Sequence, residues 1–85
     1  MEKPNLKDNQ YAVLHAEYAT GHVLNIDKTK HIVPQGGEVF LIFESKNEAF
    51  EYVKKITKEN PTIECSIWNA KNQHLATFDL NGERA

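Results

Sequence analysis

The feature that most constrains this chain is the stretch from Ser45 to Pro61, which carries the start, the buried face and the end of one helix. Ser45 and Glu48 match a capping box, in which each side chain accepts a backbone N–H at the helix start. Pro61 ends the pattern because proline lacks a backbone N–H. The sequence therefore predicts a helix from about 46 to 59. Its inward positions follow at intervals of three and four residues: Ala49, Phe50, Val53, Ile56 and Thr57, with Tyr52 at the margin.

Segments on both sides of this helix have the patterns of β-strands. Val39–Glu44 is almost continuously apolar, which is typical of a central strand covered on both faces. Two hairpins flank this unit, Tyr11–Tyr18 with His22–Ile26 and Thr62–Asn69 with His74–Leu80. The order β-β-β-α-β-β predicts an α+β fold, a five-stranded and mainly antiparallel sheet with one amphipathic helix on one face. We expect the last strand to lie between the third and fourth, because antiparallel pairs are the commoner ones; parallel neighbours are the alternative.

The register of the first hairpin follows from its pattern, because a slip of one residue moves every side chain to the other face. A three-residue loop with Gly21 in the left-handed conformation pairs Ala16 with Leu24 and Leu14 with Ile26, giving one apolar face. A two-residue loop would mix apolar and polar positions. The expected opposite face is mostly polar and pairs Glu17 with Val23, His15 with Asn25 and Val13 with Asp27.

The second hairpin has a loop centred on Lys71-Asn72. The expected apolar pairs are Ile67 with Ala76, Cys65 with Phe78 and Ile63 with Leu80. The expected reverse pairs are Trp68 with Leu75, Ser66 with Thr77 and Glu64 with Asp79. The last pair sets like charges opposite each other, a small cost at an exposed strand end.

Length and composition bound the remaining possibilities. The 85 residues suffice for a single domain, 1–85, whose ends 1–9 and 81–85 we expect to be flexible. A net charge of −2 lacks the basic excess of a nucleic-acid binder, so that partner class is disfavoured. The longest apolar run, Val39–Phe43, is far shorter than the roughly 18 residues that span a bilayer, so no membrane association is expected. The N-terminal residues lack the apolar stretch of a secretory signal, which predicts a cytoplasmic location.

No residue pattern predicts catalysis, a metal site or a cofactor. Cys65 is the only thiol, and its place between Ile63 and Ile67 favours a structural role in the core. The pair Gly36-Gly37 precedes a strand rather than a helix, so it predicts a turn and not a phosphate-binding loop. Acidic pairs such as Glu48 with Glu51 are better explained by the helix start. The histidines lack the close spacing of zinc ligands: His15, His22, His31 and His74.

The sheet face opposite the helix is the strongest candidate for function. A helix is about 10 Å wide and strands lie about 4.8 Å apart, so one helix covers only two or three strands on one side. The pattern places these residues on the helix side: Val39, Leu41, Phe43, Ile63, Cys65, Ile67 and Phe78. The other side receives four large apolar residues, which form the predicted interface: Phe40, Ile42, Trp68 and Leu75.

These observations predict a non-catalytic protein-binding or regulatory module that acts through this apolar face, with a homodimer or another protein as its partner. Two alternatives remain open. One is a small ligand-binding protein or enzyme with a pocket under the 27–38 loop. The other is a binder of single-stranded nucleic acid that stacks bases on Trp68 and Phe40, although Arg84 is the only arginine.

Overall fold

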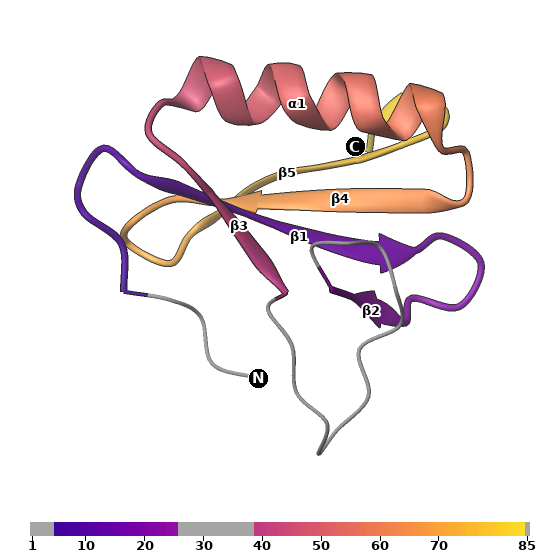
Figure 1. Cartoon of the computed structure of the whole chain (residues 1–85), viewed down its shortest axis with the longest axis horizontal. Coiled ribbons are helices and arrows are strands. Elements are labelled where there is room, and N and C mark those ends of the chain that lie inside the picture. Colours follow the sequence, from indigo (N-terminus) through magenta and orange to yellow (C-terminus); the bar gives the residue numbers. More distant parts are fainter. Residues whose placement is uncertain (1–4, 26–38, 85) are drawn as a thin grey trace.

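The computed structural model describes residues 5–25 and 39–84, which form an antiparallel sheet with one helix across one face (Figure 1). This confirms the predicted α+β class. Its elements in chain order are β1 (Tyr11–Glu17), β2 (Val23–Leu24), β3 (Phe40–Phe43), α1 (Lys46–Glu59), β4 (Ile63–Trp68), β5 (His74–Asp79) and β6 (Gly82–Glu83).

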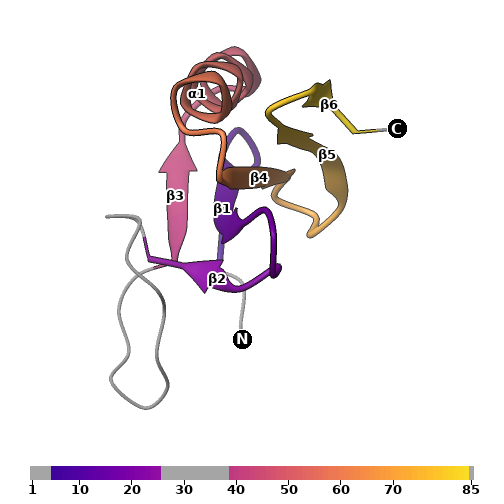
Figure 2. The same cartoon turned by 90° about the vertical axis from the view of Figure 1, so that its right-hand side faces the viewer.

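The strand order is built around β1. On one side β1 pairs with β4 from Ala12 to Glu17, and on the other side it pairs first with β3 and then with β2. The sheet continues from β4 to β5 and β6. All these pairings are antiparallel, as expected, but β1 and not β5 lies between β3 and β4, so the expected position of the last strand is wrong. Figure 2 shows β3 near one margin of the sheet and β6 at the other.

This order also corrects the expectation that the apolar run 39–44 forms a central strand. Among the described residues β3 pairs with β1 alone. The strand buried on both faces is β1, in which Ala12 and Val13 are 1% and 0% exposed. An apolar run shows that both faces of a strand have apolar neighbours, but it does not show how many strands lie beside it.

Helix α1 begins and ends where the sequence predicts. The N–H of Glu48 donates to Ser45 Oγ at 3.2 Å, which confirms the N-cap. At the other end the side chain of Asn60 donates to the carbonyl of Ile56 at 3.1 Å and satisfies one of the last carbonyls. Ala49 and Val53 are fully buried on the sheet side of the helix.

The hydrophobic core lies between α1 and the sheet. Six of the seven residues predicted for the helix side are there, with Leu41 and Phe43 half-buried at its border, while Val39 is buried but lies outside this cluster. Phe50 of the helix meets Phe78 of β5 edge to face, with ring centroids 5.8 Å apart. The buried cluster contains Val13, Leu24, Ala49, Val53, Ile56, Ile63, Cys65, Ile67, Ala76 and Phe78.

The first hairpin has a register one residue away from the expected one. Ala16 pairs with Val23 and His15 with Leu24, and the N–H of Glu17 donates to the carbonyl of His22 at 2.8 Å. The turn therefore spans four residues, 18–21. Gly21 does take the expected positive φ, at +73°. The slip exchanges the two faces of β1, so that Val13 and His15, expected on the polar face, point into the core.

The second hairpin confirms most of its predicted register. Cys65 pairs with Phe78, Ser66 with Thr77 and Ile67 with Ala76. A bulge follows Ile67, so that Trp68 pairs with His74 and the expected pairing of Trp68 with Leu75 is wrong. The expected pairing of Ile63 with Leu80 is also absent from the described ladder, since Leu80 lies in the turn after β5 and is 48% exposed.

Residues near both ends of the described chain make defined contacts. Gly82–Glu83, expected to belong to a flexible end, pair with β5 as β6, and the N–H of Arg84 donates to the carbonyl of Thr77 at 2.7 Å. Near the other end, the side chain of Gln10 donates to the carboxylate of Glu44 at 3.1 Å.

Candidate functional site

The candidate site is the open face of the sheet, the side that α1 does not cover. Strand register places its side chains in rows, because residues directly opposite each other in neighbouring strands share a face. One row runs Ile42, Ala12, Trp68 across β3, β1 and β4. The next row runs from Phe40 through Leu14 to the hydroxyl residues Ser66 and Thr77.

The apolar half of this face forms a continuous surface, which we call the open-face patch: Leu14, Phe40, Ile42 and Trp68. Ile42 is 37% exposed, and the other three side chains are half-buried. Ala12, the small residue between Ile42 and Trp68, is 1% exposed, so the larger neighbours close over it. A shallow pocket beside Trp68 is lined in part by Ala12 and Leu6.

The structure thus brings together three of the four residues predicted for the interface. Phe40, Ile42 and Trp68 lie on the open face, and they are joined by Leu14, which the sequence predicted only as part of the apolar face of the first hairpin. Leu75 does not join them. It lies at the bulge of β5, is half-buried and packs against the hydrophobic core.

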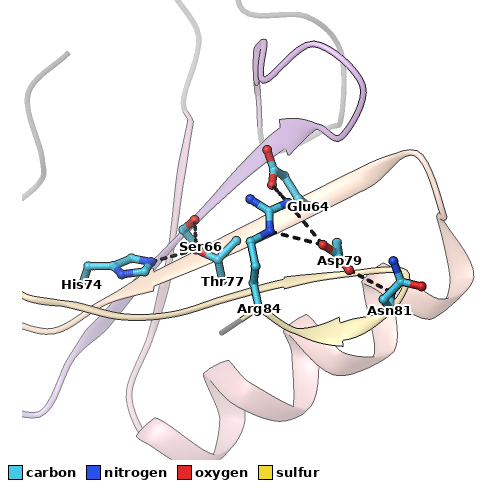
Figure 3. Close-up of polar contacts among 7 residues, drawn as sticks. All are labelled: Glu64, Ser66, His74, Thr77, Asp79, Asn81 and Arg84. Atoms are coloured by element: carbon cyan, nitrogen blue, oxygen red, sulfur yellow. Dashed lines mark hydrogen bonds and ion pairs between the residues drawn. The ribbon is translucent and has the colours of Figure 1, made fainter.

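The polar half of the open face is an ion-pair cluster of Glu64 on β4, Asp79 on β5 and Arg84, which follows β6 (Figure 3). The guanidinium of Arg84 donates to Glu64 and to Asp79, the latter at 3.2 Å. Asp79, 6% exposed, also accepts the backbone N–H of Asn81 at 2.8 Å. The repulsion expected between Glu64 and Asp79 is therefore offset by a cation, Arg84, from a segment that the sequence assigned to a flexible end.

The same cluster sets the charge state of Arg84. Desolvation of the guanidinium opposes ionisation, but the hydrogen bond with Asp79 and the charge of Glu64 outweigh it, so the pKa of Arg84 is raised above its ordinary value. The guanidinium also stands over the ring of Tyr18, 5.8 Å from its centroid. Both carboxylates and the aromatic ring hold this arginine at the protein surface.

A chain of hydrogen bonds links His74 to the centre of the face (Figure 3). Nε2 of His74 lies 2.8 Å from the hydroxyl of Thr77, which lies 2.9 Å from the hydroxyl of Ser66. A hydroxyl and a histidine at this distance are the parts of an activated nucleophile. Here, however, the contact that orients the exposed imidazole is the ring of Trp68, 5.2 Å away between centroids, and not a carboxylate. The arrangement fits a polar binding border better than a catalytic site.

A second group of chemically interesting residues lies under α1. His15 is 0% exposed, and its Nε2 shares a hydrogen bond with the hydroxyl of Tyr52 at 2.6 Å. Cys65 stands opposite His15 in the β1–β4 ladder and is also 0% exposed. Desolvation, and to a smaller extent the charge of Cys65, raises the pKa of Tyr52 to about 12. The burial of Cys65 agrees with a structural role, whereas the sequence had placed His15 on a polar face.

Other kinds of site find little support in the part of the chain that the structure describes. Within residues 5–25 and 39–84, no three or more His, Cys, Asp and Glu side chains gather as metal ligands would. No helix there has the length and apolar character needed to cross a bilayer. The Gly36-Gly37 turn, His31 and the pocket expected under the 27–38 loop lie outside the described residues.

Comparison with known proteins adds no assignment: no family model, curated protein or solved structure matches this chain significantly.

Proposed function

We propose that this chain is a non-catalytic protein-binding module whose open-face patch contacts another protein. The observation that carries the proposal is the register. It aligns Ile42 with Trp68 across Ala12, and Phe40 with Leu14 in the next row, on the side away from the helix. Four large apolar side chains on one face of so small a domain form a contiguous surface of the kind that marks contact sites in soluble proteins.

The polar half of the face indicates the chemistry of the partner. Glu64 and Asp79 share the single guanidinium of Arg84, so the cluster carries one negative charge more than positive charge. It lies beside the row that contains Leu14. A protein segment that lays apolar side chains on the open-face patch and directs a lysine or arginine toward Glu64 would complement both halves. Trp68 is the natural anchor, because tryptophan is enriched among the residues that dominate binding energies.

The same contacts disfavour the nucleic-acid alternative. Stacking of bases on an open sheet face is normally accompanied by basic side chains that neutralise phosphates. Arg84 already binds two carboxylates, and those carboxylates would repel a phosphate backbone.

The ligand-pocket alternative rested on the 27–38 loop and gains no support from the described residues. We also propose a cytoplasmic location, because a single cysteine buried in the core suits a reducing compartment.

The test is selection of binding peptides from a random library displayed on phage, with the purified chain as bait. We expect selected peptides to combine aromatic or aliphatic anchors with a basic residue. We also expect their binding to shift the backbone NMR signals of Trp68, Leu14 and Ile42. Trp68→Lys should weaken binding at least tenfold, because it puts a charge at the anchor. Leu80→Lys is the matched control, since Leu80 is equally apolar and 48% exposed but lies outside the patch.

Peptides whose signals map away from the patch, or whose affinity is unchanged by Trp68→Lys, would overturn the proposal. Retained binding in Leu80→Lys, together with loss in Trp68→Lys, supports it. A circular dichroism spectrum of each variant shows that the fold is intact.

A further inference from the structure

The outer edge of β3 is the edge of an apolar strand. Its four residues are Phe-Leu-Ile-Phe, without a charge, a proline or a bulge. Natural sheets protect such edges with charges, prolines, bulges or very short strands, because unpaired backbone groups at an apolar edge recruit another strand. The opposite margin of this sheet is protected in that way. There β6 is only two residues long, and it is followed by the ion-paired Arg84.

The hydrogen-bond directions of β1 show which groups of β3 face outward. N–H groups alternate between the two edges of a strand. The N–H of Glu17 donates to His22 on the β2 side, and the N–H of Tyr18 donates to Thr62 on the β4 side. Because β2 and β3 flank the same edge of β1, the odd-numbered residues of β1 are the ones that exchange hydrogen bonds with β3.

Val13 and Tyr11 therefore bind the backbone of their partners Leu41 and Phe43. The N–H and C=O groups of Phe40 and Ile42 point the other way, toward the margin of the sheet. Among residues 5–25 and 39–84, no strand pairs with that margin. Two donors and two acceptors are thus presented along an apolar strand.

We propose that a second copy of this chain pairs with this edge, β3 antiparallel to β3, so that the two sheets become one. A two-fold axis through Leu41 sets Leu41 opposite Leu41 of the second copy and Phe40 opposite Ile42 of the second copy. This register matches the outward groups, since each Phe40–Ile42 pair exchanges two backbone hydrogen bonds and symmetry repeats the exchange.

The side chains of the strand favour this register. All opposed residues from Val39 to Phe43 are apolar, and both copies keep their helices on the same side of the joined sheet. A two-fold axis through Ile42 would instead set Glu44 opposite Phe40 of the second copy. The strand thus complements itself, so the occupant that suits it best is another β3. This inference concerns the edge of the sheet and does not depend on binding at the open-face patch.

The first test uses the unmodified chain at protein concentrations from roughly 10 µM to 1 mM. Sedimentation velocity measures the mass, and amide hydrogen exchange followed by NMR measures the protection of each backbone amide. We expect the mass to rise from 9.7 kDa toward twice that value. The amides of Phe40 and Ile42 should become protected in parallel. The amides of Leu41 and Phe43 should be protected at every concentration, because they bind β1 within one copy.

Two outcomes would overturn the proposal. One is a chain that stays at 9.7 kDa throughout. The other is an association that leaves exchange at Phe40 and Ile42 unchanged, which would place the contact elsewhere, on the open-face patch for example.

Two substitutions test the same pairing. Ile42→Pro removes an outward N–H and spares the β1–β3 hydrogen bonds, so it should leave a folded monomer, whereas Ile42→Val should associate like the parent. If Ile42→Pro does not fold, the variant Leu41→Cys tests the pairing of the two β3 strands instead. Directly opposed cysteines in a non-hydrogen-bonded pair lie close enough for a disulfide. We expect a covalent dimer from Leu41→Cys and none from Ile42→Cys. Equal cross-linking of both, or of neither, would contradict the register and the proposal.

Discussion

His15 of β1 and Tyr52 of α1 are joined by a hydrogen bond of 2.6 Å that ties the helix to the central strand. Their rings also meet edge to face, with centroids 5.6 Å apart. The imidazole is 0% exposed, and the tyrosine hydroxyl satisfies its Nε2 inside the core.

Removing both partners of this pair should destabilise the fold by less than the sum of the two single removals. Tyr52→Phe removes the hydroxyl that hydrogen-bonds Nε2 of the buried His15, which should cost about 1–3 kcal/mol. The double change His15→Leu, Tyr52→Phe replaces both polar groups with apolar ones and should cost less than the sum of the single changes. A double-mutant cycle of urea unfolding measures this difference. Additive single effects would show that the two residues are not coupled.

Alkaline pH should weaken the fold through Tyr52. Its pKa is raised from 10.0 to about 12 by desolvation and by the charge of Cys65, so the native state keeps a proton that the unfolded chain releases. This contribution to stability is complete below pH 10 and is lost as the pH rises toward 12. The urea midpoint of the parent should therefore fall over that range more steeply than that of Tyr52→Phe.

The hydrogen bond that Ser45 accepts at the start of α1 should stabilise the fold. Ser45→Ala removes the oxygen that accepts the N–H of Glu48, and should lower the free energy of unfolding by about 0.5–2 kcal/mol. Ser45→Asp keeps an acceptor at the N-cap and should restore most of that loss. Equal urea midpoints for the parent and Ser45→Ala would show that this hydrogen bond does not cap the helix in solution.

Cys65 should behave as a core residue toward thiol reagents. Its side chain is 0% exposed between α1 and the sheet, so labelling requires the fold to open. We expect slow modification in native buffer and fast modification in urea. Rapid native modification would indicate an accessible thiolate and would contradict this packing.

The sequence predicted well the features that depend on neighbouring residues. The Ser45 cap, the end of α1 at Glu59 and the Cys65–Phe78 pairing each follow from local spacing, and the structure confirms them. The side-chain directions of β3 followed from its alternation, so Phe40 and Ile42 were placed on the correct face.

The features that depend on distant residues were predicted less well. The pattern of the first hairpin predicted a three-residue loop, but the four-residue turn of the structure shifts the register by one residue. His15 points inward because Tyr52, 37 positions later in the chain, binds it. The bulge that separates Trp68 from Leu75, and the arginine that joins Glu64 to Asp79, likewise depend on contacts that no local pattern shows.

The central claim is that the open-face patch contacts a protein, and Trp68 is a built-in reporter for it. It is the only tryptophan in the chain and lies within the patch, half-buried. Its emission can therefore be followed while a selected peptide is titrated into the parent chain, with acrylamide added to quench exposed tryptophan.

We predict a shift of the emission to shorter wavelength and a fall in quenching, both saturating with the same dissociation constant as the binding itself. Leu80→Lys should give the same curves. A peptide that binds fully while the emission and quenching of Trp68 stay unchanged would contradict the claim.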